Sequence, residues 1–139
     1  SGTEDAYAVA LKVTLAYTAL EALEDAIGCK HQIEIADPDL AYEFRSRENA
    51  KFIKAIGISL EGPRCDRCRK TWNSFQSEKS DDLRPIVYAI RNLMAHGKLT
   101  AENLNLPSSK YRRKLLEDLA ELTLLKCDER FTQYVQRMR

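Results

Sequence analysis

The residues with the clearest chemistry in this 139-residue chain are Arg91 and Asn92, followed after three apolar residues by His96 and Gly97. A guanidinium offers five donors to a phosphate, and an imidazole exchanges protons near neutral pH. In a continuous helix, positions 91 and 96 would lie on different faces, about 140° apart. If the helix ends just before His96, with Gly97 in a left-handed cap, the imidazole can swing back toward Arg91. The spacing therefore predicts that a permanently charged donor group and a titratable group lie together at one helix end.

A plainer interpretation stays open for the same residues. Cations are favourable at the C-terminal end of a helix, so Arg91 and His96 could serve only to cap one.

A second candidate is the pair Cys65 and Cys68, whose spacing suits half of a tetrahedral zinc site. Cys29 and His31 could complete it if the first connection of the chain folds beside them. The alternative is two free thiols in a basic loop, because the distance between the two halves fits no common zinc pattern. We therefore expect no cofactor, with these four residues as the one candidate zinc set.

Two clusters of basic residues are candidate contacts to nucleic-acid phosphates. Trp72 and Phe75 follow the first cluster and could stack on bases if exposed. The alternative is a solvated loop that these two aromatic residues pin to the core. The second cluster begins a predicted helix, where the helix dipole disfavours cations. The candidates are Arg64, Arg67, Arg69 and Lys70 in the first cluster and Arg112 and Arg113 in the second.

Apolar residues at steps of three and four predict the helices that must position these groups. The first helix spans 4–27 and ends before Gly28, and the second spans 38–56 with a polar, weaker middle. Residues 57–79 read as a long irregular segment with room for one short helix. The third helix follows the caps at 80–82 and ends at Gly97, and the fourth runs from 108 or 109 to 138. These elements predict an all-α, up-and-down four-helix bundle forming a single domain over residues 1–139.

At this point the sequence resembles the HEPN superfamily of small helical bundles. Arg91, Asn92 and His96 match its Arg-x4-6-His signature, at the end of a third helix and before a long fourth one. The segment 17–23 is similar to the corresponding part of the first HEPN helix. The resemblance implies a metal-independent endoribonuclease acting as a homodimer, in which both protomers line one cleft. In such an enzyme His96 would be the general acid or base, Arg91 would bind the scissile phosphate, and Asn92 would orient the imidazole or the phosphate by hydrogen bonds. Its alternative is a catalytically inactive relative that binds RNA, a nucleotide or a protein partner.

Composition excludes several other classes. A chain that is 44% hydrophobic with only 5 Gly can build a helical core without disulfides, and its four cysteines are too few for a secreted framework. No apolar run is long enough to cross a membrane, so we expect a cytoplasmic protein without a membrane partner. The net charge of +1 combines an acidic first segment, at −6 over residues 1–40, with basic later ones. A one-sided basic surface for RNA is one consequence, and simple packing of oppositely charged helices is the other.

Overall fold

The computed structural model describes residues 2–61, 66–97 and 110–139. Over these ranges the protein is all-α, and its one extended pairing is an isolated antiparallel bridge between Ala36 and Asp82. The helices are α1 (Gly2–Ile27), α2 (Pro38–Phe44), the 3-10 turn η1 (Arg47–Asn49), α3 (Ala50–Ser59), α4 (Asp66–Gln76), α5 (Arg84–Ala95) and α7 (Lys110–Arg137).

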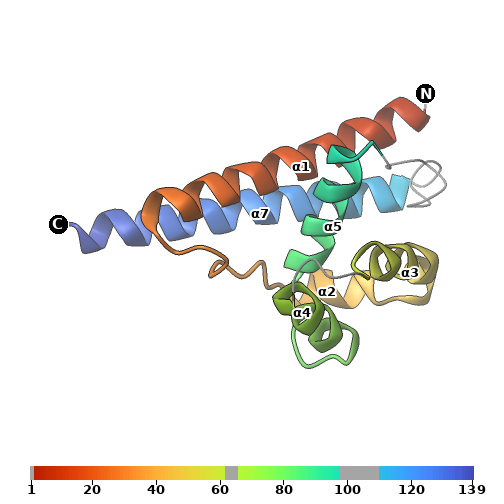
Figure 1. The fold of residues 1–139 in the computed structure, drawn as a ribbon. Coiled ribbons are helices and arrows are strands. Elements are labelled where there is room, and N and C mark those ends of the chain that lie inside the picture. The colour runs from red at the N-terminus through yellow and green to blue at the C-terminus, as the bar shows by residue number, and fades with distance from the viewer. Residues whose placement is uncertain (1, 62–65, 98–109) are drawn as a thin grey trace.

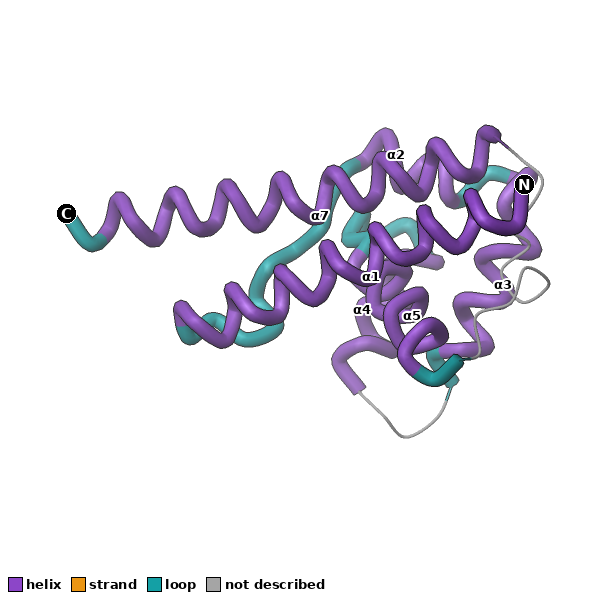
Figure 2. Tube along the Cα trace, turned by 90° about the horizontal axis from the view of Figure 1, so that it is seen from above, coloured by secondary structure: helices purple, strands orange, loops and turns teal. Residues whose placement is uncertain are grey.

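The two longest helices, α1 and α7, lie side by side and run in the same direction, with the C-terminal turns of α7 extending past the end of α1 (Figures 1 and 2). Helix α5 crosses α1 steeply, and the three shorter helices gather around the N-terminal end of α5 (Figure 1). The first and last helices of an up-and-down four-helix bundle run antiparallel, so the predicted bundle order is not the one observed.

The departure begins where the predicted second helix breaks. Asp37 caps α2 by accepting the Leu40 N–H at 3.0 Å, but the helix ends at Phe44 and the chain turns through η1 before α3. The Arg45 side chain holds this turn by donating to the Phe75 carbonyl and to Asp81, both at 2.9 Å, and its guanidinium lies 4.3 Å from the Phe75 ring centroid. The turn is thereby tied to the connection before α5.

The predicted irregular segment also contains more helix than expected. Residues 66–76 form α4, whose Trp72 and Phe75 rings are buried and stacked with their centroids 5.6 Å apart. The alternative in which these aromatic residues anchor the segment to the core is therefore correct. Gly57 of α3 faces this packing, and a Cβ there would make an ordinary contact with the Trp72 indole nitrogen at 3.4 Å.

The core lies where α5 packs between α1, α7 and the shorter helices. Its largest fully buried side chains include Tyr17 and Leu20 from α1, Phe44 and Phe52 from α2 and α3, Ile86 and Ile90 from α5, and Leu116 from α7. Burial of this apolar surface fixes α5 against α1, and so fixes the side chains that α5 presents to it. No helix in the described ranges is both long and apolar enough to cross a membrane.

Candidate functional site

Helix α5 carries the predicted motif and begins and ends as its sequence indicates. At the start, the Asp82 carboxylate accepts the N–H groups of Arg84 and Ile35, both at 3.0 Å. At the end, the His96 N–H donates to the Asn92 carbonyl at 3.0 Å, and Gly97 has the left-handed φ of +64°. The predicted glycine cap is thus confirmed, and it leaves His96 in the terminating turn.

The Arg91 guanidinium points toward α1. It donates to Glu21 Oε1 at 2.7 Å and to Asn92 Oδ1 at 2.9 Å, and its carbon lies 5.9 Å from the Tyr17 ring centroid. About a third of the Arg91 side chain, and of the Glu21 side chain, remains exposed. Asn92 therefore orients Arg91 through its side-chain oxygen, and the role predicted for it toward the imidazole or a phosphate stays a prediction. Two of the five guanidinium donors are used in these bonds, and hydrogen bonds within the described part of the chain leave others for a ligand.

His96 is exposed at the end of α5. Within the described part of the chain, no hydrogen bond or ion pair joins its imidazole to Arg91. The predicted approach of the two side chains is therefore not made in this conformation, because Glu21 and Asn92 hold the guanidinium. The imidazole remains open to solvent and to a partner molecule.

Sequence reasoning missed a second arginine on α5. Arg84 donates to both carboxylate oxygens of Glu24, at 2.6 and 2.8 Å, and to the Ile33 carbonyl at 2.7 Å. Burial alone would raise the pKa of Glu24, but the hydrogen bonds from Arg84 and from the Ile33 N–H hold it below its ordinary value. The opposite charge of Glu24 likewise raises the pKa of Arg84, although burial acts to lower it. This pair locks the start of α5 to α1.

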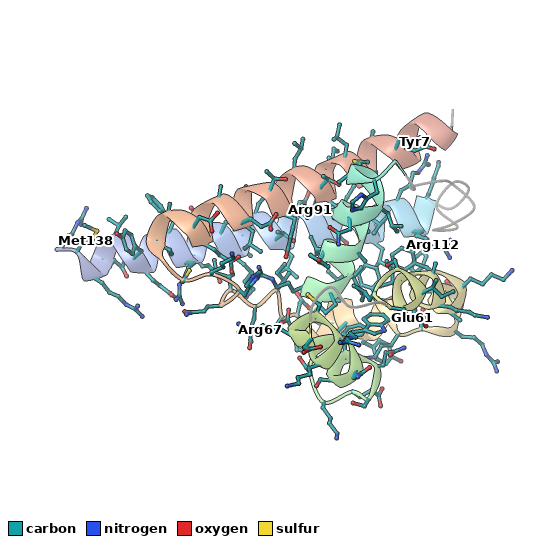
Figure 3. The ribbon with its side chains drawn as sticks, in the orientation of Figure 1. Tyr7, Glu61, Arg67, Arg91, Arg112 and Met138 are labelled. Atoms are coloured by element: carbon teal, nitrogen blue, oxygen red, sulfur yellow. The ribbon has the colours of Figure 1, made fainter. Side chains whose placement is uncertain are left out.

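Between these elements lies a cavity of about 430 Å³, with walls from α1, the connection after α1, α4 and α5. Its lining includes Tyr17, His31, Arg67, Cys68, Arg84 and Arg91. Figure 3 shows the labelled Arg67 on α4 and Arg91 on α5. Burial raises the pKa of the Tyr17 phenol to about 12, so this ring stays neutral beside the two α5 arginines.

Three members of the candidate zinc set lie in the described part of the chain, and they do not come together as a metal site. Cys29 is buried in the apolar core, whereas the exposed His31 and the half-buried Cys68 line the cavity. Cys65 lies outside the described residues. Elsewhere in the described ranges, no three His, Cys, Asp or Glu side chains are grouped closely enough to hold a metal ion.

The nucleic-acid candidates divide into exposed and buried residues. Arg67, Arg69 and Lys70 are exposed on α4, where Arg69 pairs with Asp66. Arg64 lies outside the described residues. The aromatic side chains expected to stack on bases are buried, so they cannot do so without unfolding α4.

Arg112 is a correction, because it is buried where α7 begins. It donates to the Glu48 carbonyl at 3.0 Å and to Asn49 Oδ1 at 3.4 Å, and burial lowers its pKa. Arg112 thus fastens α7 to η1, and we withdraw it as a phosphate contact. The neighbouring Arg113 is half-buried and, with Lys12, Lys110 and Lys114, lines a shallow hollow of about 380 Å³ between α1 and α7.

Comparison with known proteins gives no relative, since no family model, no curated protein and no solved structure matches the chain.

Proposed function

We propose that the protein is a HEPN-like, metal-independent endoribonuclease whose site is the end of α5. The observation that carries this proposal is the left-handed turn at Gly97, which presents an exposed His96 while Asn92 orients Arg91 one and a half turns back along the helix. The motif also precedes the long α7, as the resemblance to the HEPN superfamily requires. A helix end that carries both a side chain able to transfer protons and a side chain able to bind phosphate is suited to the cleavage of RNA.

The reaction assigned to these residues is transesterification. The ribose 2′-oxygen attacks the adjacent phosphorus, its proton passes to an imidazole, and the bond from phosphorus to the 5′-oxygen breaks. The leaving oxygen takes a proton from a second acid, and the products are a 2′,3′-cyclic phosphate and a 5′-hydroxyl. Arg91 stabilises the charge that develops on the non-bridging oxygens with the donors that Glu21 and Asn92 leave unused.

One histidine serves poorly as both base and acid, which is why the proposal includes a homodimer. His96 of one protomer would take the proton of the 2′-hydroxyl. His96 of its partner would donate a proton to the leaving 5′-oxygen. Exposed apolar side chains on α1 and α7 offer area for such pairing, among them Leu11, Leu15, Leu124, Leu125 and Phe131. Exposed cations on α4 and in the hollow lined by Arg113 support contact with RNA phosphates.

The test is cleavage of a structured RNA in excess EDTA by the wild type, His96→Ala and Arg91→Ala. We expect each variant to lose about a hundredfold or more of the rate, the usual contribution of a positioned acid or base or of one oxyanion donor. Arg137→Ala is the matched control, since it removes an exposed arginine in the last turn of α7, outside the motif and both basic clusters. Products should carry cyclic phosphate ends. Activity that depends on added metal, or that survives in both variants, would contradict the proposal.

The second candidate is a non-catalytic module that binds RNA, a nucleotide or a protein partner. The observation favouring it is that the Arg91 guanidinium is already held by Glu21 and Asn92 and does not contact His96. In this case all four proteins would be equally inert in EDTA, while Arg91→Ala would still weaken retention of RNA on a filter.

A further inference from the structure

We infer that two copies of the chain pair in antiparallel orientation through the outer face of α1, about a two-fold axis that crosses the helix between Thr18 and Ala19. The outer face consists of the exposed residues Leu11, Leu15, Thr18, Ala19, Ala22 and Ala26. The inference rests on the homodimer of the proposed function, to which it adds the surface, the orientation and the register of the pairing.

The outer face is exposed and almost free of charge. Leu11 and Leu15 are 48% and 59% exposed, and Figure 1 shows α1 along the upper edge of the molecule, with α7 and the shorter helices below it. Of the exposed residues between positions 8 and 22, Lys12 alone is charged, although 31% of the whole chain is charged. An apolar patch that is depleted of charge is typical of the centre of a protein interface.

The one hydroxyl on the outer face is already hydrogen-bonded within α1. Thr18 donates from Oγ1 to the Thr14 carbonyl at 2.9 Å. The face can therefore be covered by a second protein without leaving a buried polar side chain unpaired, which would cost free energy.

The sizes of the side chains select an antiparallel partner. The N-terminal half of the face carries Leu11 and Leu15, and the C-terminal half carries Ala19, Ala22 and Ala26. Parallel pairing would place leucine on leucine and alanine on alanine, which leaves voids beside the alanines. Antiparallel pairing about the stated axis places Leu15 on the partner's Ala22 and Leu11 on the partner's Ala26. The face is thus complementary to itself, as a two-fold dimer requires.

An edge of α7 adds apolar surface beside the alanine half. Lys12 of α1 pairs with Glu117 of α7 at 3.7 Å, and the two helices run in the same direction. Leu124 and Phe131 follow Glu117 at steps of seven residues, so they lie on the same side of α7, and they are 50% and 51% exposed. These larger side chains next to the short alanines give the partner's leucines more surface to contact.

The apolar area suits a dimer. The outer face and the α7 edge are each about 22 Å long and about 10 Å wide, which gives about 450 Å² per copy in projection. A standard interface buries about 800 Å² per partner, of which about 65%, or about 500 Å², is apolar in homodimers. The two areas agree.

The pairing also keeps the two motif ends on one side of the dimer. Helix α5 reaches α1 through Glu21 and Glu24, on one side of the outer face, and α7 reaches it through Lys12 on the other side. A two-fold axis that lies in the interface and crosses α1 at right angles leaves both copies of α5 on the same side. One RNA molecule can then reach both motif ends.

Sedimentation equilibrium of the purified chain tests the surface. We expect a dimer whose dissociation constant rises about a hundredfold or more in Ala22→Glu, because the pairing would bury an unpaired carboxylate from each copy. Glutamate is nearly as good a helix former as alanine and position 22 is exposed, so the variant should keep the wild-type circular dichroism. Ala50→Glu is the matched control: it makes the same change at an exposed position of α3 and should leave the constant within about twofold.

Two changes of size test the orientation. Leu15→Ala opens a void and Ala22→Leu overfills the contact, so each alone should weaken the dimer about tenfold. The variant with both changes exchanges the sizes across the axis and should recover most of the wild-type affinity. In a parallel pairing positions 15 and 22 do not meet, and the two losses would add.

The outcomes separate this inference from the proposed function. A monomeric wild type, a dimer that Ala22→Glu leaves intact, or additive losses in the variant with both size changes would overturn the inference. RNA cleavage in EDTA by the same proteins tests the reaction. If Ala22→Glu is monomeric and still cleaves RNA at the wild-type rate, the pairing stands and the two-histidine reaction fails. If Ala22→Glu stays dimeric and cleaves RNA, the pairing fails and the reaction stands.

Discussion

Arg84 at the start of α5 and Arg91 near its end each reach a glutamate of α1, yet the two ion pairs lie in different environments. The Arg84 and Glu24 side chains are 12% and 2% exposed, whereas those of Arg91 and Glu21 are both 32% exposed. Tyr17 lies between them, with its ring centroid 5.4 Å from the Arg84 guanidinium carbon and 5.9 Å from that of Arg91. The difference indicates that the first pair holds the fold. Under the proposed function, the second pair positions Arg91 for a ligand.

The largest effect expected from this difference is on stability. Glu24→Gln leaves the Arg84 charge buried without its partner, so we expect it to lower the free energy of unfolding by about 3 to 5 kcal/mol. Glu21→Gln breaks a half-exposed pair and should cost less than about 1 kcal/mol. Urea unfolding followed by circular dichroism measures both. Equal losses in the two variants would remove the distinction between the pairs.

Acid unfolding sharpens the same comparison. The folded-state pKa of Glu24 lies below its ordinary value near 4.5, so its stabilising contribution is complete above that pH. The contribution disappears as the pH falls through the lowered folded-state value. Glu24→Gln should therefore flatten the acid limb of the stability profile, and an unchanged limb would count against the buried pair.

The intermediate effect concerns the phenol between the two arginines. Because burial raises the pKa of Tyr17 to about 12, the unfolded chain releases this proton from about pH 10 while the folded protein keeps it. Stability should therefore fall by about 2 to 3 kcal/mol as the pH rises from 10 to 12. Tyr17→Phe should show a shallower alkaline limb in the same unfolding experiment. Parallel limbs for the two proteins would place Tyr17 in contact with water.

The smallest expected loss of stability comes from replacing the glycine that follows α5 or the glycine that follows α1. Gly97 and Gly28 have φ values of +64° and +72°, and a Cβ at either position would meet no atom within 4 Å. Alanine at each should cost about 1 kcal/mol, for the backbone alone. Only Gly97→Ala should also slow RNA cleavage, because it disturbs the turn that presents His96. Equal rates of RNA cleavage by both variants would show that the turn at Gly97 is not needed for cleavage.

The sequence predicted the strongly periodic elements well. The apolar stripes over α1, α5 and α7 and the glycine after α5 placed these helices to within a few residues, because burial of one face determines them. For α4 the sequence predicted no more than one short helix within an irregular segment. The reason is that only Trp72 and Phe75 mark the buried face of this helix. The break after Phe44 falls in the polar middle that the sequence marks as weak, but the contacts of Arg45 that hold the turn reach residues about 30 positions away, which no local pattern contains.

The candidate site was predicted in part for similar reasons. Arg91, Asn92 and His96 were found from their types and spacing, but the partner Glu21 lies 70 residues from Arg91 in the chain. The Arg84 pair and the buried Arg112 were missed because a charged residue looks like surface until its tertiary partner is known. The sequence did contain one signal for the two ion pairs. Glu21 and Glu24 lie three residues apart on the first helix, and the helix that carries the motif has two arginines to match them.

The most direct test of the account compares Arg84→Met and Arg91→Met for unfolding in urea and for RNA cleavage in EDTA. We predict that Arg84→Met loses several kcal/mol of stability, by about the amount expected for a broken buried pair, whereas Arg91→Met loses less than about 1 kcal/mol and about a hundredfold in cleavage rate. Cleavage by a stably folded Arg91→Met at the wild-type rate would contradict the account, as would an equal loss of stability in the two variants.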